Sequence, residues 1–163
     1  MSLNTSELWD SMPKFSAGRP ERRAMQPSFP AGCYALAVEI IGTGIDATDI
    51  DRIADAIGRY GDRFLRRVFT EGEIAYCQAR RDSFPSFAAR FSAKEAAMKA
   101  LGTGHSRGVF WTGIEVFRRG GPPQLRFHGG AADRLAALGA NGSLLTLTHS
   151  KNLAIAHVLI LKR

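Results

Sequence analysis

The sequence has few cysteines and no long hydrophobic run. Its 163 residues include only two cysteines, Cys33 and Cys77, which are too few for a disulfide scaffold and lack the spacing of a zinc site. No run of about 18 apolar residues occurs, so no membrane-spanning helix is predicted. Neither terminus has the hydrophobic segment of a secretory signal, which favours a cytoplasmic protein.

Acidic residues are in the minority. The chain has 22 Lys and Arg against 15 Asp and Glu, which gives a formal net charge of +7. A basic surface attracts polyanions, so the candidate partners are nucleic acid, phosphorylated small molecules and acidic proteins. Hydrophobic residues make up 45% of the chain, as in ordinary globular proteins. The length suits one domain.

Prolines gather near the N-terminus. Residues 1–30 contain Pro13, Pro20, Pro27 and Pro30 and show no sustained hydrophobic period. This composition predicts a mostly irregular N-terminal extension over residues 1–30, followed by a single domain over residues 31–163.

The pattern of the remaining chain predicts an α+β fold, with a small antiparallel sheet packed with helices. An apolar run over 34–41 predicts a buried strand, and residues 42–46 predict a turn before a helix capped by Thr48. Thr70 and Glu73 form a capping box that opens a second helix, and a third helix is expected over 87–101. Four strands, over 113–118, 124–128, 143–148 and 154–161, and a short helix over 131–138 are expected in the last third.

Residues 42–47 formally fit the dinucleotide-binding pattern G-x-G-x-x-A. However, Asp46 would repel a pyrophosphate unless a cation lay between them, and the late strands do not form βαβ units. A carboxylate at this position can hold Mg²⁺, which then holds phosphate oxygens. The residues alone leave both a metal ligand and an ordinary turn aspartate open, and favour the second.

Charged residues repeat every four positions on the predicted third helix. Glu95 precedes Lys99 and Arg90 precedes Lys94, and the helix ends at Gly102. Such pairs are common on helix surfaces, but cations with one carboxylate also suit a site for a metal and a phosphate. His149 lies in a polar turn between two apolar strands, where it is either a turn residue or a site residue.

Four motifs together resemble the holo-acyl-carrier-protein synthases, which are short bacterial-type 4′-phosphopantetheinyl transferases. In order, they are Gly42-x-Gly44-Ile45-Asp46, the Arg63–Glu73 segment, the Ala89–Gly104 segment with its Lys-Glu-Ala-x-x-Lys pattern, and Thr148-His149-Ser150. The resemblance runs from about residue 34 to 161. This chain departs from it at Pro122, where the family commonly has lysine.

The resemblance implies the transfer of 4′-phosphopantetheine from coenzyme A to a serine of apo-acyl carrier protein, with release of 3′,5′-ADP. It implies that Asp46 and Glu95 hold Mg²⁺ and that Lys99 completes the catalytic group. It implies coenzyme A contacts from Arg90, Lys94, Lys99, Gly102 and His149, and contacts with an acidic carrier from Arg52, Arg59, Arg63 and Arg67. It further implies a homotrimer that serves fatty acid biosynthesis, in which His149 serves a neighbouring subunit's site.

Two other classes of protein fit part of the pattern. An RNA-binding module would explain the positive charge, but the basic strands lack aromatic residues on which bases could stack. A non-catalytic subunit of a larger fatty acid or polyketide system would keep the fold and transfer nothing. We expect neither a nucleic-acid partner nor a membrane span.

Overall fold

The computed structural model describes residues 38–163, so the expected extension over residues 1–30 and Cys33 lie outside the described residues. The strands are β1 (Glu39–Asp49), β2 (Ile114–Phe117), β3 (Gln124–Phe127), β4 (Gly142–His149) and β5 (Leu153–Lys162). The helices are α2 (Ile50–Tyr60), α3 (Asp62–Val68), α4 (Glu71–Gln78), α5 (Phe84–Leu101) and α6 (Gly130–Ala137), with a 3₁₀ turn η1 (Trp111–Gly113).

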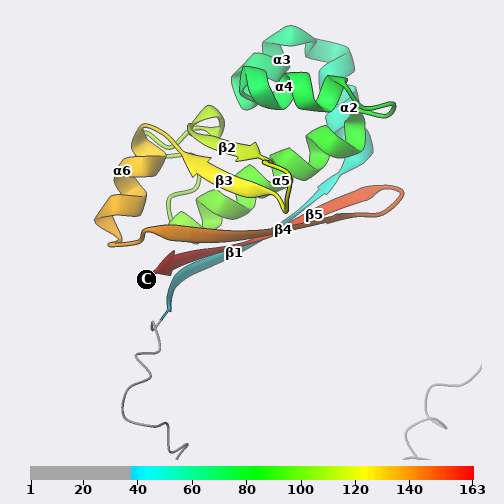
Figure 1. Ribbon diagram of the computed structural model, residues 1–163. Coiled ribbons are helices and arrows are strands. Elements are labelled where there is room, and N and C mark those ends of the chain that lie inside the picture. The colour runs from blue at the N-terminus through cyan, green and yellow to red at the C-terminus, as the bar shows by residue number, and fades with distance from the viewer. Residues whose placement is uncertain (1–37) are drawn as a thin grey trace, which may run out of the picture. The chain divides into compact units, whose positions relative to one another are not determined.

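The strands form two antiparallel sheets. Three long strands pair in the order β1-β5-β4, and β2 pairs with β3. Figure 1 shows the helices and the β2-β3 pair on one face of the three-stranded sheet, with α5 lying next to it. This arrangement confirms the predicted α+β fold. The part of the chain that the structure describes contains no helix that is both long and apolar enough to cross a membrane.

Helix α5 packs closely on β1 because both surfaces are small. Ala93, Ala96 and Ala97 are completely buried in α5, and Gly42 and Gly44 face the same helix from β1. A Cβ atom on Gly42 would collide with the carbonyl oxygen of Ala100, and one on Gly44 with that of Ala96.

The prediction of a turn at residues 42–46 was therefore wrong. These residues continue β1, pairing residue by residue with β5 as far as Asp49. The glycines serve close packing between strand and helix, whereas the sequence pattern suggested chain reversal.

The helix starts were predicted with mixed success. Helix α2 begins at Ile50, and its N-cap is Asp49, so Thr48 is a strand residue and not the cap. The capping box at α4 is confirmed: the Thr70 backbone N–H donates to Glu73 Oε2 (2.9 Å), and the Glu73 N–H donates to Thr70 Oγ1 (3.3 Å). Helix α5 begins earlier than expected, at Phe84, because proline is favourable in a first helical turn.

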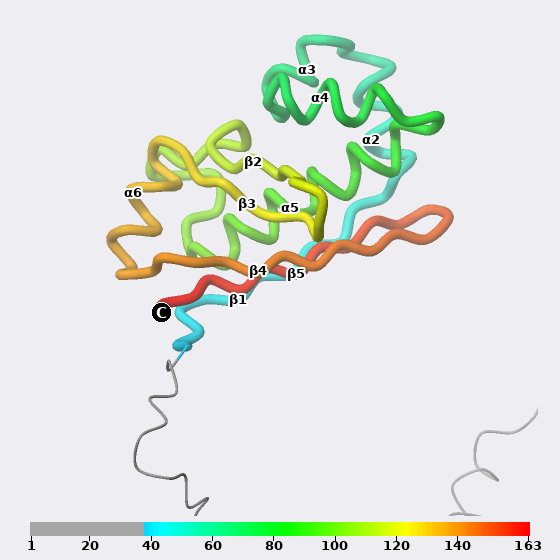
Figure 2. Tube along the Cα trace, in the orientation of Figure 1, coloured from blue at the N-terminus to red at the C-terminus, as the bar shows by residue number. Residues whose placement is uncertain are grey.

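The last two strands form a long hairpin, which Figure 2 shows as a continuous loop from β4 to β5. His149 is the last residue of β4 and pairs with Ala154. Ser150 donates its backbone N–H to the Leu153 carbonyl (2.8 Å), which closes the turn. The expected polar turn at residues 148–152 thus lies at the end of the hairpin.

Candidate functional site

The Asp46 side chain lies between β1 and α5 and is held on both oxygens. Lys99 Nζ donates to Oδ1 (2.9 Å) and also to the Ile45 carbonyl (3.0 Å). Ser92 Oγ contacts Oδ2 (3.0 Å) and the Asp46 backbone carbonyl (2.8 Å), and Thr48 Oγ1 contacts Oδ2 (2.9 Å). The Asp46 carboxylate is thus fixed in one position beside α5.

Glu95 lies on the same stripe of α5. Ser92 precedes it by three residues and Lys99 follows it by four, and residues at these spacings share a helix face. Because Asp46 contacts both Ser92 and Lys99, its carboxylate runs alongside the Glu95 position. Glu95 is half-buried, and its Oε1 accepts the indole N–H of Trp111.

This carboxylate pair suits magnesium better than a fully protein-ligated metal. Within residues 38–163 no group of three or more His, Cys, Asp or Glu side chains could hold a metal ion. Zinc sites need three or four protein ligands. Magnesium keeps several waters and is typically held by one or two carboxylates together with substrate phosphates. Asp46 and Glu95 therefore fit Mg²⁺ bound together with a phosphorylated ligand.

A cationic hollow of about 380 Å³ opens near the start of α5. Arg80, Arg90, Arg118 and His149 line it, together with Tyr76. Three guanidinium groups around one cavity favour a ligand that carries phosphate.

Arg90 is the buried arginine of this hollow. Arg90 is 5% exposed, and its Nε is buried with no hydrogen-bond partner among the described residues. Its guanidinium stacks 3.9 Å from the Tyr76 ring centre. Burial raises the pKa of Tyr76, but hydrogen bonding and charge from Arg80, then Arg90, outweigh it and bring the pKa below its ordinary value.

Lys94 does not reach this hollow. Its side chain is fully buried, pairs with Glu73 Oε2 at 2.7 Å, and donates to the carbonyls of Trp111 (2.9 Å) and Ile114. Burial lowers the Lys94 pKa, and the nearby Glu73 charge opposes that shift. The structure thus gives Lys94 a place in the core instead of the expected place in a coenzyme A site.

Gly102 ends α5. It adopts φ +68°, the left-handed conformation that favours glycine at a helix end. Its N–H donates to the Lys99 carbonyl (3.0 Å), and the N–H of Thr103 donates to that of Met98 (3.2 Å). These two amides cap the helix, so they are not available to the coenzyme A that we expected Gly102 to contact.

The predicted carrier-binding arginines are all exposed on α2 and α3. Arg52 and Arg59 lie on α2, and Arg63 and Arg67 on α3. Arg63 and Arg67 line a hollow of about 300 Å³ together with the aromatic rings of Tyr60 and Phe64. This surface combines positive charge with exposed aromatic area, which suits an acidic protein partner.

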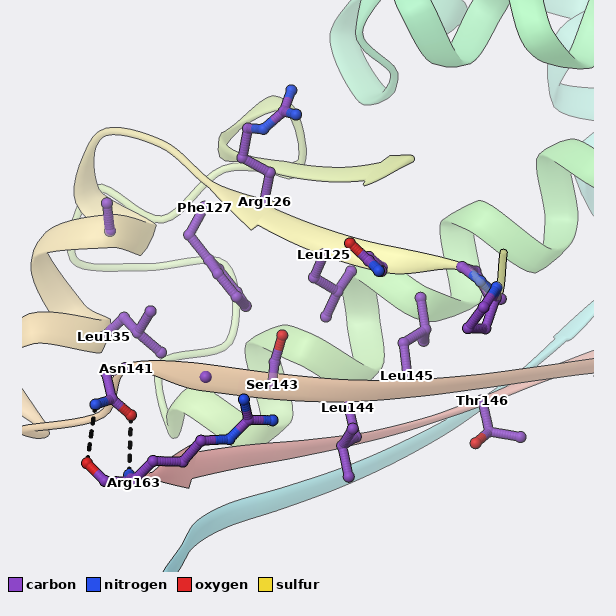
Figure 3. A pocket seen from close by; sticks show the side chains of 15 residues that line it. Leu125, Arg126, Phe127, Leu135, Asn141, Ser143, Leu144, Leu145, Thr146 and Arg163 are labelled. Atoms are coloured by element: carbon purple, nitrogen blue, oxygen red, sulfur yellow. Dashed lines mark hydrogen bonds between the residues drawn. The ribbon is translucent and has the colours of Figure 1, made fainter. Parts of the chain in front are cut away.

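A hollow of about 720 Å³ lies elsewhere, between β3 and β4. Figure 3 shows Leu125 and Leu145 reaching into it from the two strands, and Arg163 joined to Asn141 by two hydrogen bonds at one end. None of the predicted site residues lines this hollow. The candidate site is therefore the α5 stripe and the cationic hollow.

Sequence reasoning missed several residues of this site. They are Thr48, Tyr76, Arg80, Ser92, Trp111 and Arg118. Ser92 and Glu95 are three apart on α5, and Tyr76 lies in α4 four residues before Arg80, which follows the end of that helix. Spacing could have suggested both pairs. Arg118 and Trp111 come from distant segments, and no local signal connects them to α5.

Comparison with known proteins places the chain in a family. A profile of the 4′-phosphopantetheinyl transferase superfamily matches residues 42–156, and the chain belongs to that superfamily, among the holo-acyl-carrier-protein synthases. A protein named holo-[acyl-carrier-protein] synthase from Koribacter versatilis is 49% identical over 122 residues, covering 74% of this chain and 98% of that protein.

Solved structures of holo-acyl-carrier-protein synthases resemble the fold of this chain. The holo-[acyl-carrier-protein] synthase of Neisseria meningitidis has a TM-score of 0.70 at 26% identity, covering 75% of this chain and 98% of that one. A Bacillus anthracis holo-(acyl-carrier-protein) synthase, in complex with CoA (3′,5′-ADP), has a TM-score of 0.63 at 31% identity, covering 78% of this chain and 100% of that one.

Proposed function

We propose that this enzyme transfers 4′-phosphopantetheine from coenzyme A to a serine of apo-acyl carrier protein and releases 3′,5′-ADP. The Asp46 carboxylate carries the proposal, because Ser92, Thr48 and Lys99 fix it beside Glu95 on α5. In the reaction, a bond forms between the serine oxygen and the reacting phosphorus, and the bond from that phosphorus to 3′,5′-ADP breaks. The serine proton passes to a water molecule, and the 3′,5′-ADP leaving group takes the electron pair of the broken bond.

Phosphoryl transfer is catalysed mainly by neutralising the phosphate charge and by positioning the reacting groups. Asp46 and Glu95 would hold Mg²⁺, and the bound ion would offset the negative charge of the pyrophosphate. Lys99 Nζ, half-exposed and 2.9 Å from Asp46 Oδ1, can offset the charge that develops on the leaving phosphate or donate a proton to it. The two carboxylates would thus hold the ion that offsets the phosphate charge, and the lysine would stabilise the leaving phosphate as the bond breaks.

The decisive assay combines the protein with coenzyme A, Mg²⁺ and apo-acyl carrier proteins from fatty acid and polyketide systems. Transfer appears as a phosphopantetheine mass shift on the carrier, and we expect it with the fatty acid carrier. Asp46→Ala and Glu95→Ala should each abolish it, whereas Asp133→Ala on α6 should not. No mass shift with any carrier would favour a non-catalytic subunit. Near-normal turnover of either site variant at saturating Mg²⁺ would refute the metal assignment.

The cationic hollow is the proposed site for the phosphates of coenzyme A. Arg80, Arg90 and Arg118 line it together with His149, and three arginines around one cavity favour an anion. A Bacillus anthracis relative was solved with CoA (3′,5′-ADP), which supports the same ligand class here. Arg80→Ala and Arg118→Ala should raise the KM for coenzyme A more than they lower kcat. An unchanged KM in both variants would place coenzyme A elsewhere.

The arginines of α2 and α3 are the proposed surface for an acidic carrier protein. Reversing Arg63 to Glu should slow association and flatten the salt dependence of kcat/KM, with turnover at saturating carrier changed less. Arg163→Glu changes the net charge equally at the far end of the chain and is the matched control. Equal salt dependence in Arg63→Glu, Arg52→Glu and the control would remove this surface from the interface.

The open face of the three-stranded sheet supports a homotrimer. Figure 1 shows no described helix on this face, and Ile45 and Leu144 on the sheet are 62% and 53% exposed. His157 lies opposite Ile45 and Thr146, and its Nε2 is 3.0 Å from Thr43 Oγ1. Apolar and hydroxyl side chains on an open sheet face suit a second and third copy of the chain.

Light scattering tests this assembly, and a monomer at working concentration would refute it. Mixed trimers of Asp46→Ala and His149→Ala then show whose site His149 serves. Partial recovery of activity would assign His149 to a neighbouring subunit. If His149→Ala is itself impaired, no recovery would assign His149 to its own chain, where it lines the same hollow as Arg90. We place the enzyme in the cytoplasm.

A further inference from the structure

Trp111 is joined to the proposed metal site by its side chain. It lies in η1, sixteen residues after Glu95, and its indole N–H donates to Glu95 Oε1. No other ring N–H in the described chain donates to either proposed metal ligand. The bond engages one carboxylate oxygen, and the second oxygen is left for a cation.

The backbone of Trp111 is held by the residue next to Glu95. Lys94 Nζ donates to the Trp111 carbonyl (2.9 Å), and the same ammonium pairs with the buried Glu73 at 2.7 Å. Adjacent α5 residues therefore bind the two ends of one tryptophan. Lys94 fixes its main chain, and Trp111 in turn fixes the Glu95 carboxylate.

Aromatic neighbours restrict the indole ring further. The His105 ring centre lies 4.2 Å from that of Trp111, and the Phe91 ring centre lies 6.1 Å from it. Phe91 is one helical turn before Glu95, so it supports the ring from the same face of α5. A ring packed on two sides cannot swing away without losing these contacts.

We propose that Trp111 is a positioning residue, which holds the Glu95 carboxylate in the orientation that accepts Mg²⁺ alongside Asp46. This inference rests on the proposed magnesium site. A free glutamate has three rotatable side-chain bonds, and fixing it before the ion binds removes an entropic cost from binding. Hydrogen bonds to metal ligands commonly change metal affinity by about 10-fold to 100-fold when they are removed.

Trp111→Phe tests the inference, because phenylalanine keeps a ring in the packed site and removes only the N–H donor. We expect the variant to bind Mn²⁺ alone about 10-fold more weakly, measured by electron paramagnetic resonance of the free ion. The Mg²⁺ concentration for half-maximal activity should rise similarly, and kcat should fall by a smaller factor than this concentration rises. Trp9→Phe is the matched control, since it is the same substitution outside the superfamily match.

Equal Mn²⁺ affinity in Trp111→Phe and the control would overturn the inference. A second measurement avoids any folding defect of the variant. In Trp9→Phe protein, Trp111 is the only tryptophan, so its fluorescence should shift as Mg²⁺ neutralises the neighbouring carboxylate. Adding Glu95→Gln to the Trp9→Phe protein should remove that shift. An unchanged spectrum with Mg²⁺ in the Trp9→Phe protein itself would also refute the role. Failure of the proposed function appears separately, as Mn²⁺ binding without any phosphopantetheine transfer.

Discussion

Replacing Lys94 by methionine removes a buried positive charge while nearly preserving side-chain volume. The ammonium has three partners: the Glu73 carboxylate and the carbonyls of Trp111 and Ile114. Glu73 in turn accepts the backbone N–H of Val116 at 2.9 Å. The pair therefore joins α4, α5, η1 and β2 at one point, where both side chains are fully buried.

The expected loss of stability follows from what remains after the substitution. Glu73 keeps hydrogen bonds from two backbone N–H groups but loses its counter-charge. The Ile114 carbonyl loses the ammonium as a donor, and the Trp111 carbonyl keeps only the Ile114 N–H. Breaking a buried ion pair by removing one partner costs about 3–5 kcal/mol of unfolding free energy. For a domain of this size each 1 kcal/mol lowers Tm by about 2–4 °C, so we expect a drop of about 6–20 °C.

The double variant Lys94→Met/Glu73→Gln separates the charge from the packing. Glutamine is neutral and keeps one acceptor oxygen for a backbone N–H, so the double variant should recover about half of the lost stability. Urea and thermal unfolding at one fixed protein concentration measure both variants, because assembly would make Tm concentration-dependent.

A loss below about 1 kcal/mol in Lys94→Met would refute this reasoning, which assigns the pair to the core. The same variant also addresses coenzyme A. At low temperature and saturating Mg²⁺, we expect its KM for coenzyme A to match that of the parent protein. A strongly raised KM with unchanged stability would return Lys94 to the coenzyme A site.

Three further outcomes are expected. Gly44→Ala places a methyl group against the Ala96 carbonyl and should lower the free energy of unfolding in urea by about 1–3 kcal/mol or more. The control Gly58→Ala adds a methyl group that meets no atom within 4 Å and should raise the free energy of unfolding by about 0.5–1 kcal/mol. Burial raises the pKa of Cys77 to about 11, so in Cys33→Ser protein its alkylation at pH 8 should be slow and should accelerate on unfolding; rapid alkylation of the folded protein would contradict its burial. Chelation with EDTA should abolish transfer reversibly with little change in the far-ultraviolet circular dichroism, and a collapse of that signal would indicate a structural metal instead.

Local patterns predicted local structure well. The capping box at Thr70, the glycine end of α5 and the four late strands all depend on neighbouring residues, and the structure confirms them. The prediction of a turn at residues 42–46 was wrong because a pair of glycines has more than one structural use. A glycine pair after an apolar run is typical of a turn, but here it lets a strand approach a helix whose residues lie about fifty positions away.

The site was only partly predictable for the same reason. Asp46, Glu95 and Lys99 were named from motifs, and the structure brings Asp46 and Lys99 into direct contact. Arg118 and Trp111 reach α5 only because β2 and the preceding loop fold back over it. Such long-range contacts depend on the packing of the whole domain, which no window of the sequence contains.

Lys94 and Glu95 illustrate what a motif leaves undetermined. Successive residues on a helix point about 100° apart, so neighbours in sequence face different surroundings. On α5 the Lys94 side chain is enclosed by α4, η1 and β2, and its ammonium is buried with Glu73. The Glu95 direction stays half-exposed beside Asp46, where a cation can reach it. The lysine and the glutamate of one motif thus have different roles. Lys94 holds the backbone of Trp111, and Glu95 accepts the hydrogen bond of the Trp111 indole at the edge of the site.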